Sequence, residues 1–160
     1  MRLQILAACC LANGYGSLPA ANAADRHVGD DAEFAAALNS AEPGDRILLA
    51  PGIYRGGISH RGLDGVTISS QQPGNRAVID AGGVGQALHL SSATNVVIEN
   101  LILRNYFNNG VNIDDGGDWP AGKSSHITLR NLEITNETAP PGNRDGVKLS
   151  GVDHFVIDRL

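Results

Sequence analysis

The sequence predicts an all-β fold: a right-handed parallel β-helix, or solenoid, with a short N-terminal capping helix. Two short β phrases recur in the same order along the chain, and apolar and polar residues alternate within them. The 160 residues include 20 glycines and only 4% aromatic residues, a composition that suits many tight turns between short strands. In a solenoid, each coil buries its apolar face only by stacking on its neighbours.

One phrase occurs three times, and a second phrase precedes each copy. The first is found at 96–101, 127–132 and 155–160, and the second at 87–90, 110–113 and 146–149. Side chains alternate between the two faces of a strand, so the apolar residues of the second phrase are expected to point inward. The polar residues between them are expected to form one outward row on successive coils: His89, Asn112 and Lys148. The next outward row is expected to hold Ser91, Asp114 and Ser150.

A sharp corner is expected at the end of the first phrase, where Asn100 and Asn131 align. Stacked asparagine side chains can hydrogen-bond to the neighbouring coil and satisfy the backbone of such a corner. Arg159 takes the third position. We therefore expect the asparagine ladder to stop or turn outward there.

A short helix is expected before the strands. Asp30 is an acceptor at the N-cap position and Glu33 follows three residues later, which is a capping-box pattern. The apolar face of the helix is expected to contain Phe34, Ala35 and Leu38, and Pro43-Gly44 is expected to end it. Strands bounded by Gly or Pro are then expected at 46–50, 66–68 and 77–80. The helix would cover the open end of the first coil.

Residues 1–24 have the pattern of a signal peptide. Arg2 supplies the positive charge, residues 5–11 form an apolar core, and residues 21–23 read Ala-Asn-Ala, a cleavage signal. We therefore expect a periplasmic or extracellular (secreted) protein. Lipoprotein anchoring at Cys9 is the alternative, but the apolar run before it is short. Both cysteines, Cys9 and Cys10, lie in this leader, so the mature chain is expected to have no disulfide and no thiolate metal site.

Residues 25–160 are expected to form one β-helix domain. The net charge of -5 gives no basic patch for nucleic acid, and no stretch reaches the roughly 18 apolar residues that a membrane span needs. We expect a monomer. The third copy of the repeat ends at Leu160 without a closing cap, so we expect a chain that is truncated at the C-terminus.

The stretch Pro43-Gly44-Asp45-Arg46-Ile47-Leu48-Leu49-Ala50-Pro51-Gly52-Ile53-Tyr54 resembles the opening motif of β-helix proteins of the pectate-lyase superfamily. The chain from about residue 30 to 160 is similar to the N-terminal part of alginate lyase and chondroitinase B-type polysaccharide lyases. The resemblance implies an acidic polysaccharide partner and cleavage by β-elimination. The catalytic Lys/Arg and calcium-binding carboxylates of those lyases lie on later coils, so the resemblance assigns none of them here and leaves enzymatic activity open.

A second resemblance is local. The stretch Asn143-Arg144-Asp145-Gly146-Val147-Lys148-Leu149 is similar to the N-T-D-G-I-D-I stretch of polygalacturonases, with Arg in place of Thr. It implies that Asp145 is an acid/base carboxylate. The first alternative function is therefore a polygalacturonase-type glycoside hydrolase in which Asp145 works with a second carboxylate such as Asp114. A noncatalytic carbohydrate-binding or surface β-helix is the second alternative.

The outward rows supply the chemistry that a lyase needs. β-Elimination requires a base for the proton next to a uronate carboxylate and a cation for the resulting enolate. Lys148 is the candidate base. Ca²⁺ is the candidate cation, because hard cations prefer several oxygen ligands. Its candidate ligands are Asp114, Asp115 and Asp118.

Further residues are candidates for substrate binding. His89 and Asn112 lie on the predicted outward row, and an exposed Trp119 at a loop tip can stack on a sugar ring. Each candidate also has an ordinary structural interpretation. Asp114-Asp115-Gly116-Gly117 is a turn sequence, Lys148 and His89 are common residues on an exposed strand, and Trp119 can pack its own loop against a coil.

Overall fold

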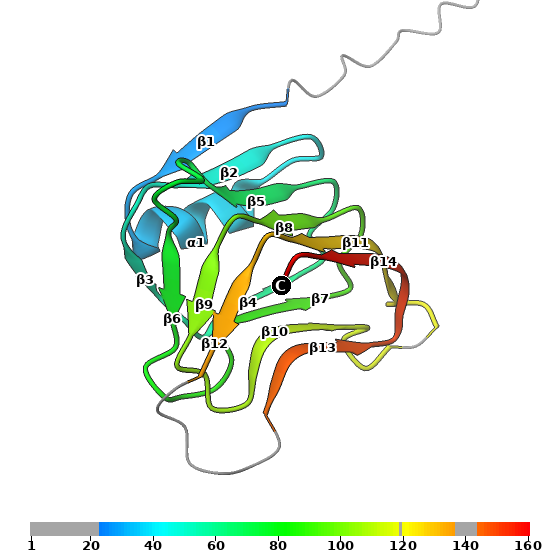
Figure 1. The fold of residues 1–160 in the computed structure, drawn as a ribbon. Coiled ribbons are helices and arrows are strands. Elements are labelled where there is room, and N and C mark those ends of the chain that lie inside the picture. The colour runs from blue at the N-terminus through cyan, green and yellow to red at the C-terminus, as the bar shows by residue number, and fades with distance from the viewer. Residues whose placement is uncertain (1–22, 119, 137–143) are drawn as a thin grey trace, which may run out of the picture.

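The protein is described by a computed structural model that covers residues 23–118, 120–136 and 144–160. Three parallel sheets run the length of the stack (Figure 1). The predicted signal peptide therefore lies almost entirely outside the described residues, and Trp119 lies outside them as well.

The first sheet has six strands in the order β1 (Asp25–Val28), β2 (Arg46–Leu49), β5 (Thr67–Ser70), β8 (Val97–Glu99), β11 (Ser124–Arg130) and β14 (Val152–Asp158). The second has four strands in the order β13 (Asp145–Ser150), β10 (Asn109–Asp114), β7 (Leu88–Ser91) and β4 (Ile58–Arg61). The third has four strands in the order β12 (Glu133–Thr135), β9 (Ile102–Arg104), β6 (Val78–Asp80) and β3 (Ile53–Arg55).

From β2 onward, consecutive strands belong to different sheets, so the chain winds around a common axis. β7, β8 and β9 form one coil, and β10 begins the next beside β7 (Figure 1). All strand pairs between coils are parallel and in register. The predicted parallel β-helix is confirmed.

Apolar side chains fill the interior in columns. In the first sheet, Ile68, Ile98 and Leu129 are register partners, and each is at most 1% exposed. Leu88 and Val111 form a second column in the sheet that contains β7 and β10, and both are fully buried. Each fully buried aliphatic side chain contributes roughly 1.5–3 kcal/mol to folding. The columns therefore hold the coils together without a disulfide among the described residues.

The short helix α1 (Asp31–Ser40) packs against β1, β2 and β4 near the N-terminal end of the stack (Figure 1). The Asp30 side chain accepts a hydrogen bond of 2.8 Å from the Glu33 amide, and the Glu33 carboxylate accepts one of 2.7 Å from the Gly29 amide. The predicted capping helix is thus confirmed. It ends at Ser40, before Pro43.

The prediction that Ala35 belongs to the apolar face of the helix is wrong. Phe34, Ala37 and Leu38 are buried, whereas Ala35 is exposed. Phe34, Ala37 and Leu38 are three and four residues apart and form the centre of the buried face, and Ala35 lies at its edge, toward solvent. No helix in the described ranges is long and apolar enough to cross a membrane.

Candidate functional site

The outer face of the sheet formed by β4, β7, β10 and β13 carries a polar row. Register pairs join Ser59 to His89, His89 to Asn112, and Asn112 to Lys148. The predicted alignment of the last three residues is confirmed, and Ser59 extends it by one coil. We call these four residues the outer row.

The neighbouring row runs beside it on the same face. Its register partners in order are Arg61, Ser91, Asp114 and Ser150. The predicted second row is confirmed, and Arg61 extends it. Neighbouring strands are about 4.8 Å apart, so both rows present one side chain per coil at a regular spacing.

His89 and Asp114 form a hydrogen-bonded contact between the two rows. His89 Nε2 lies 2.8 Å from Asp114 Oδ2, and Ser91 Oγ lies 3.1 Å from the same nitrogen. On the other side of the ring, His89 Nδ1 lies 3.3 Å from Ser59 Oγ. We assign the ring proton to Nε2, because a carboxylate oxygen can only accept there. This leaves the lone pair of Nδ1 directed to the Ser59 hydroxyl.

The Asp114 carboxylate is held in its charged form. Burial raises the pKa of Asp114, but hydrogen bonds from Ser91, His89 and the Gly116 amide outweigh it and lower the pKa below its ordinary value. The Gly116 amide donates to Oδ1 over 2.9 Å. Gly116 adopts a φ of 68°, a conformation that glycine tolerates, so the turn folds back onto its own strand end. An ionised Asp114 can therefore orient the imidazole of His89 at neutral pH.

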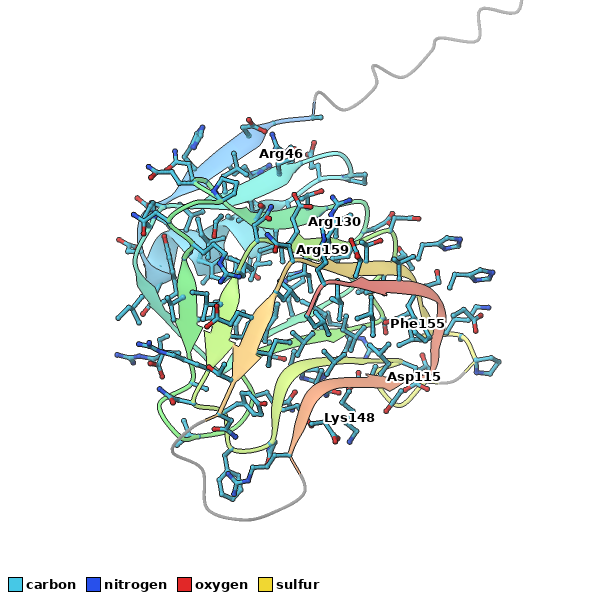
Figure 2. All side chains as sticks on the ribbon, viewed as in Figure 1. Arg46, Asp115, Arg130, Lys148, Phe155 and Arg159 are labelled. Carbon is cyan, nitrogen blue, oxygen red and sulfur yellow. The ribbon has the colours of Figure 1, made fainter. Side chains whose placement is uncertain are left out.

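Asn112 and Lys148 differ in exposure. Asn112 is only 7% exposed, its Nδ2 donates to Asp114 Oδ2 over 3.3 Å, and its Oδ1 has no hydrogen-bond partner among the described residues. Lys148 is exposed on β13, and Figure 2 places it near the β13 end of the sheet. The described part of the chain gives Lys148 no ion pair. Its charge is therefore accessible to a ligand, whereas Asn112 mainly supports Asp114.

Asp145 lies at the far end of β13 from Asp114. Asp145 pairs with Asn109, and Asp114 pairs with Ser150, five residues further along the strand. At about 3.3 Å per residue, the two aspartates are separated by about 16 Å, which exceeds the roughly 6.5–9.5 Å of an inverting carboxyl pair. The predicted pairing of Asp145 with Asp114 is wrong, because the register puts them at opposite strand ends.

The predicted calcium ligands do not gather around one point. The Asp114 carboxylate already accepts hydrogen bonds from the His89 ring and the Gly116 amide. Asp115 Oδ1 accepts a hydrogen bond of 2.9 Å from the Gly117 amide. Within the described ranges, no three His, Cys, Asp or Glu side chains are arranged to hold a metal ion, Asp118 included. Calcium binding stays a prediction.

Sequence reasoning missed Ser59 and Arg61, because β4 was not predicted. The sequence signal for β4 is weak, because Ile58 is the only apolar residue of Ile58-Ser59-His60-Arg61 and the inward position 60 is a histidine. Ser59 lies 30 residues before His89. The coils of the repeat are not equal in length, so a fixed period could not locate it. Arg61 Nη1 donates to the Gly116 carbonyl over 3.2 Å, which brings the guanidinium next to the Asp114 turn.

A cavity of about 270 Å³ opens beside the start of the outer row. Phe34, Ala35 and Ile58 form much of its apolar wall, and Ser59 lies at its border together with Asp31 and Arg55. The helix that caps the stack therefore also shapes a hollow next to an exposed serine.

Comparisons with known proteins agree with this architecture. No protein-family model matches the chain, and no curated protein matches it. The alginate lyase from Paenibacillus sp. str. FPU-7 is similar in structure, with a TM-score of 0.50 and 22% sequence identity over 81% of this chain and 57% of that chain. An arginine-to-alanine variant of a PL6 family alginate lyase has a TM-score of 0.41 and 20% identity over 68% of this chain and 18% of that chain. The chain thus spans just over half of the Paenibacillus enzyme, and the likeness to that enzyme shows a shared fold.

Proposed function

We propose that the protein binds an acidic polysaccharide along the outer row and cleaves it by β-elimination. The observation that carries this proposal is the in-register alignment of Ser59, His89 and Lys148 on one sheet face, with the Lys148 ammonium exposed at one end. A polymer of sugar rings can contact successive coils of such a row. The fold shared with the Paenibacillus alginate lyase makes alginate the first polymer to test.

Each side chain has a distinct part in the proposed reaction. The Lys148 ammonium attracts the uronate carboxylate and stabilises the charge that develops on it. His89 Nδ1 takes the proton from the carbon next to the carboxylate, since Asp114 holds the opposite side of the ring. The released electron pair forms a C=C bond, the glycosidic C–O bond breaks, and the leaving oxygen takes a proton from water. The sequence placed the base at Lys148, whereas the geometry favours His89.

The test is the ultraviolet absorbance of the new C=C bond during incubation with alginate. We expect His89→Ala and Lys148→Ala each to lower the rate by roughly 10²-fold or more. Lys123→Ala is the matched control, because this lysine pairs with Asp153 and belongs to a different sheet edge. Equal rates for the Lys148 and Lys123 variants would contradict the proposed role of Lys148.

Two other results would assign a different function. Reducing ends without the absorbance would indicate hydrolysis. Retardation on a polysaccharide affinity gel without either product would indicate a binding protein, and loss of that retardation in Lys148→Ala would still place the binding on the outer row.

A further inference from the structure

Three side chains from three successive coils form a continuous hydrogen-bonded line. Ser59 on β4 contacts His89 on β7 over 3.3 Å, and His89 contacts Asp114 on β10 over 2.8 Å. The serine and the carboxylate approach different ring nitrogens. This is the order of groups found in an activated serine nucleophile: hydroxyl, imidazole base and orienting carboxylate.

The two serines beside His89 are not equivalent. Ser59 is exposed and contacts Nδ1, the nitrogen that carries the lone pair, whereas Ser91 is 8% exposed and contacts Nε2. Only the first can reach a substrate from solvent with its proton already directed to a base. Serine–histidine contacts of this length are common before substrate binds and tighten in the complex.

Two neighbouring features fit an ester substrate. The cavity of about 270 Å³ borders Ser59 on the side of α1, and its walls from Phe34, Ala35 and Ile58 suit a small apolar acyl group. Arg61 follows Ser59 by two residues on the same exposed face. Its guanidinium has five N–H donors, and one is fixed on the Gly116 carbonyl, so others are available to a developing oxyanion.

We infer that Ser59, His89 and Asp114 form a catalytic triad that hydrolyses a small carboxylic ester, such as an O-acyl group on a sugar hydroxyl. Ser59 Oγ attacks the ester carbonyl while His89 Nδ1 takes its proton. The C–O bond to the alcohol breaks, and the alcohol oxygen takes that proton from His89. Water then attacks the acyl-serine with His89 again as base, which releases the carboxylic acid and restores the hydroxyl. The alcohol part of the ester would lie over His89, along the outer row.

The test uses p-nitrophenyl acetate as substrate and a fluorophosphonate as a covalent probe of Ser59. We expect the unmodified protein to turn over the ester and to carry the label on the peptide that contains Ser59, identified by mass spectrometry. Ser59→Ala should lose the label and at least roughly 100-fold of the rate. Ser150→Ala is the matched control, because it removes an exposed serine hydroxyl on the same sheet face. This variant should keep both the covalent label on Ser59 and the rate of ester hydrolysis. Circular dichroism checks that both variants fold.

The outcomes separate this activity from polysaccharide cleavage. His89→Ala should lose ester hydrolysis and alginate cleavage. Ser59→Ala should lower the rate of ester hydrolysis far more than that of alginate cleavage, and Lys148→Ala should do the reverse. Absence of both turnover and label in the unmodified protein would overturn the inference. So would an unchanged rate or an unchanged label in Ser59→Ala. Because the small ester does not require a bound polymer, either activity can fail while the other stands.

Discussion

The side chain of Asn131 donates a hydrogen bond of 2.7 Å from Nδ2 to Oδ1 of Asn100, one coil earlier in the stack. Asn100 in turn donates to Ser69 Oγ over 3.2 Å. The backbone is in the left-handed conformation at both asparagines, with a φ of 57° at Asn100 and 50° at Asn131. Arg159 adopts the same conformation one coil later, with a φ of 54°. The corner therefore keeps its backbone shape through the third coil, although the amide ladder ends.

Asn131→Ala should destabilise the protein by roughly 2 kcal/mol. Asparagine tolerates the left-handed conformation better than alanine, which meets more of its roughly 1–2 kcal/mol cost, and the lost hydrogen bond adds about 1 kcal/mol. Thermal or urea unfolding measures the change. Asn131→Gly is the matched variant, since it removes the same hydrogen bond but tolerates the backbone. An equal loss in both variants would show that the conformation of this corner carries none of the effect.

Asp114→Asn should weaken both activities assigned to His89. The amide keeps the shape of the side chain, but it no longer supplies a negative charge beside Nε2, and its own N–H₂ can face the ring in place of an acceptor. We expect the rate of alginate cleavage and of ester hydrolysis to fall by roughly 10²-fold or more. Asp115→Asn is the control, because Asp115 follows in the chain but its Oδ1 binds the Gly117 amide. Similar losses in the two variants would contradict a specific role for Asp114.

Much of the fold could be predicted from short-range pattern alone. Alternation placed His89, Asn112 and Lys148 on one row, because a register between coils follows wherever one strand face is buried. Five strands were missed: β1, β3, β4, β9 and β12. β1 has a polar sequence whose pairing with β2 depends on contacts made far along the chain, and β4 sits in a coil whose loops differ in length from the regular repeat.

The candidate site was harder to predict than the fold. The sequence grouped Asp114 with its chain neighbours Asp115 and Asp118, whereas the structure joins it to His89, 25 residues away. The calcium site was predicted because these three aspartates are close together along the chain. The contacts that matter instead run across the coils, so they depend on the exact length of each intervening loop, which composition and periodicity do not fix.

Asp45 should make stability depend on acid pH. This carboxylate is 2% exposed. It accepts hydrogen bonds from the amides of Glu42 and Ala24 and from the Arg26 side chain. The Glu42 amide is the largest cause that lowers its pKa; burial opposes this, and Ala24 and Arg26 add to the lowering. A pKa depressed on folding stabilises the protein above the unfolded value of about 3.9, and that stability is lost as the pH falls through the folded value.

The measurement is the melting temperature of the unmodified protein and of Asp45→Asn between about pH 7 and about pH 3. We expect the variant to melt lower at neutral pH, because its amide cannot replace all the accepted hydrogen bonds, and the gap to narrow below about pH 4. Asp25→Asn is the control, since Asp25 is half-exposed beside Arg46 and should change little at any pH. A gap that stays constant across the range would contradict the assigned titration.

Gly110→Ala should destabilise β10 at a point where two coils meet closely. A Cβ at this position would lie 2.5 Å from Ile134 Cγ2 and 2.6 Å from the Gly146 carbonyl oxygen. The Gly146 oxygen belongs to the backbone of the paired strand, so it can retreat only if the strands separate. Overpacking of this kind costs roughly 1–3 kcal/mol. Gly74→Ala is the control, because nothing lies within 4 Å of a Cβ there. The measurement is urea unfolding. The urea midpoint of Gly110→Ala should be lower than that of the unmodified protein, whereas the unfolding free energy of Gly74→Ala should stay within about 0.5 kcal/mol of it. Equal midpoints for the two variants would mean that β10 and β13 have room for a methyl group between them.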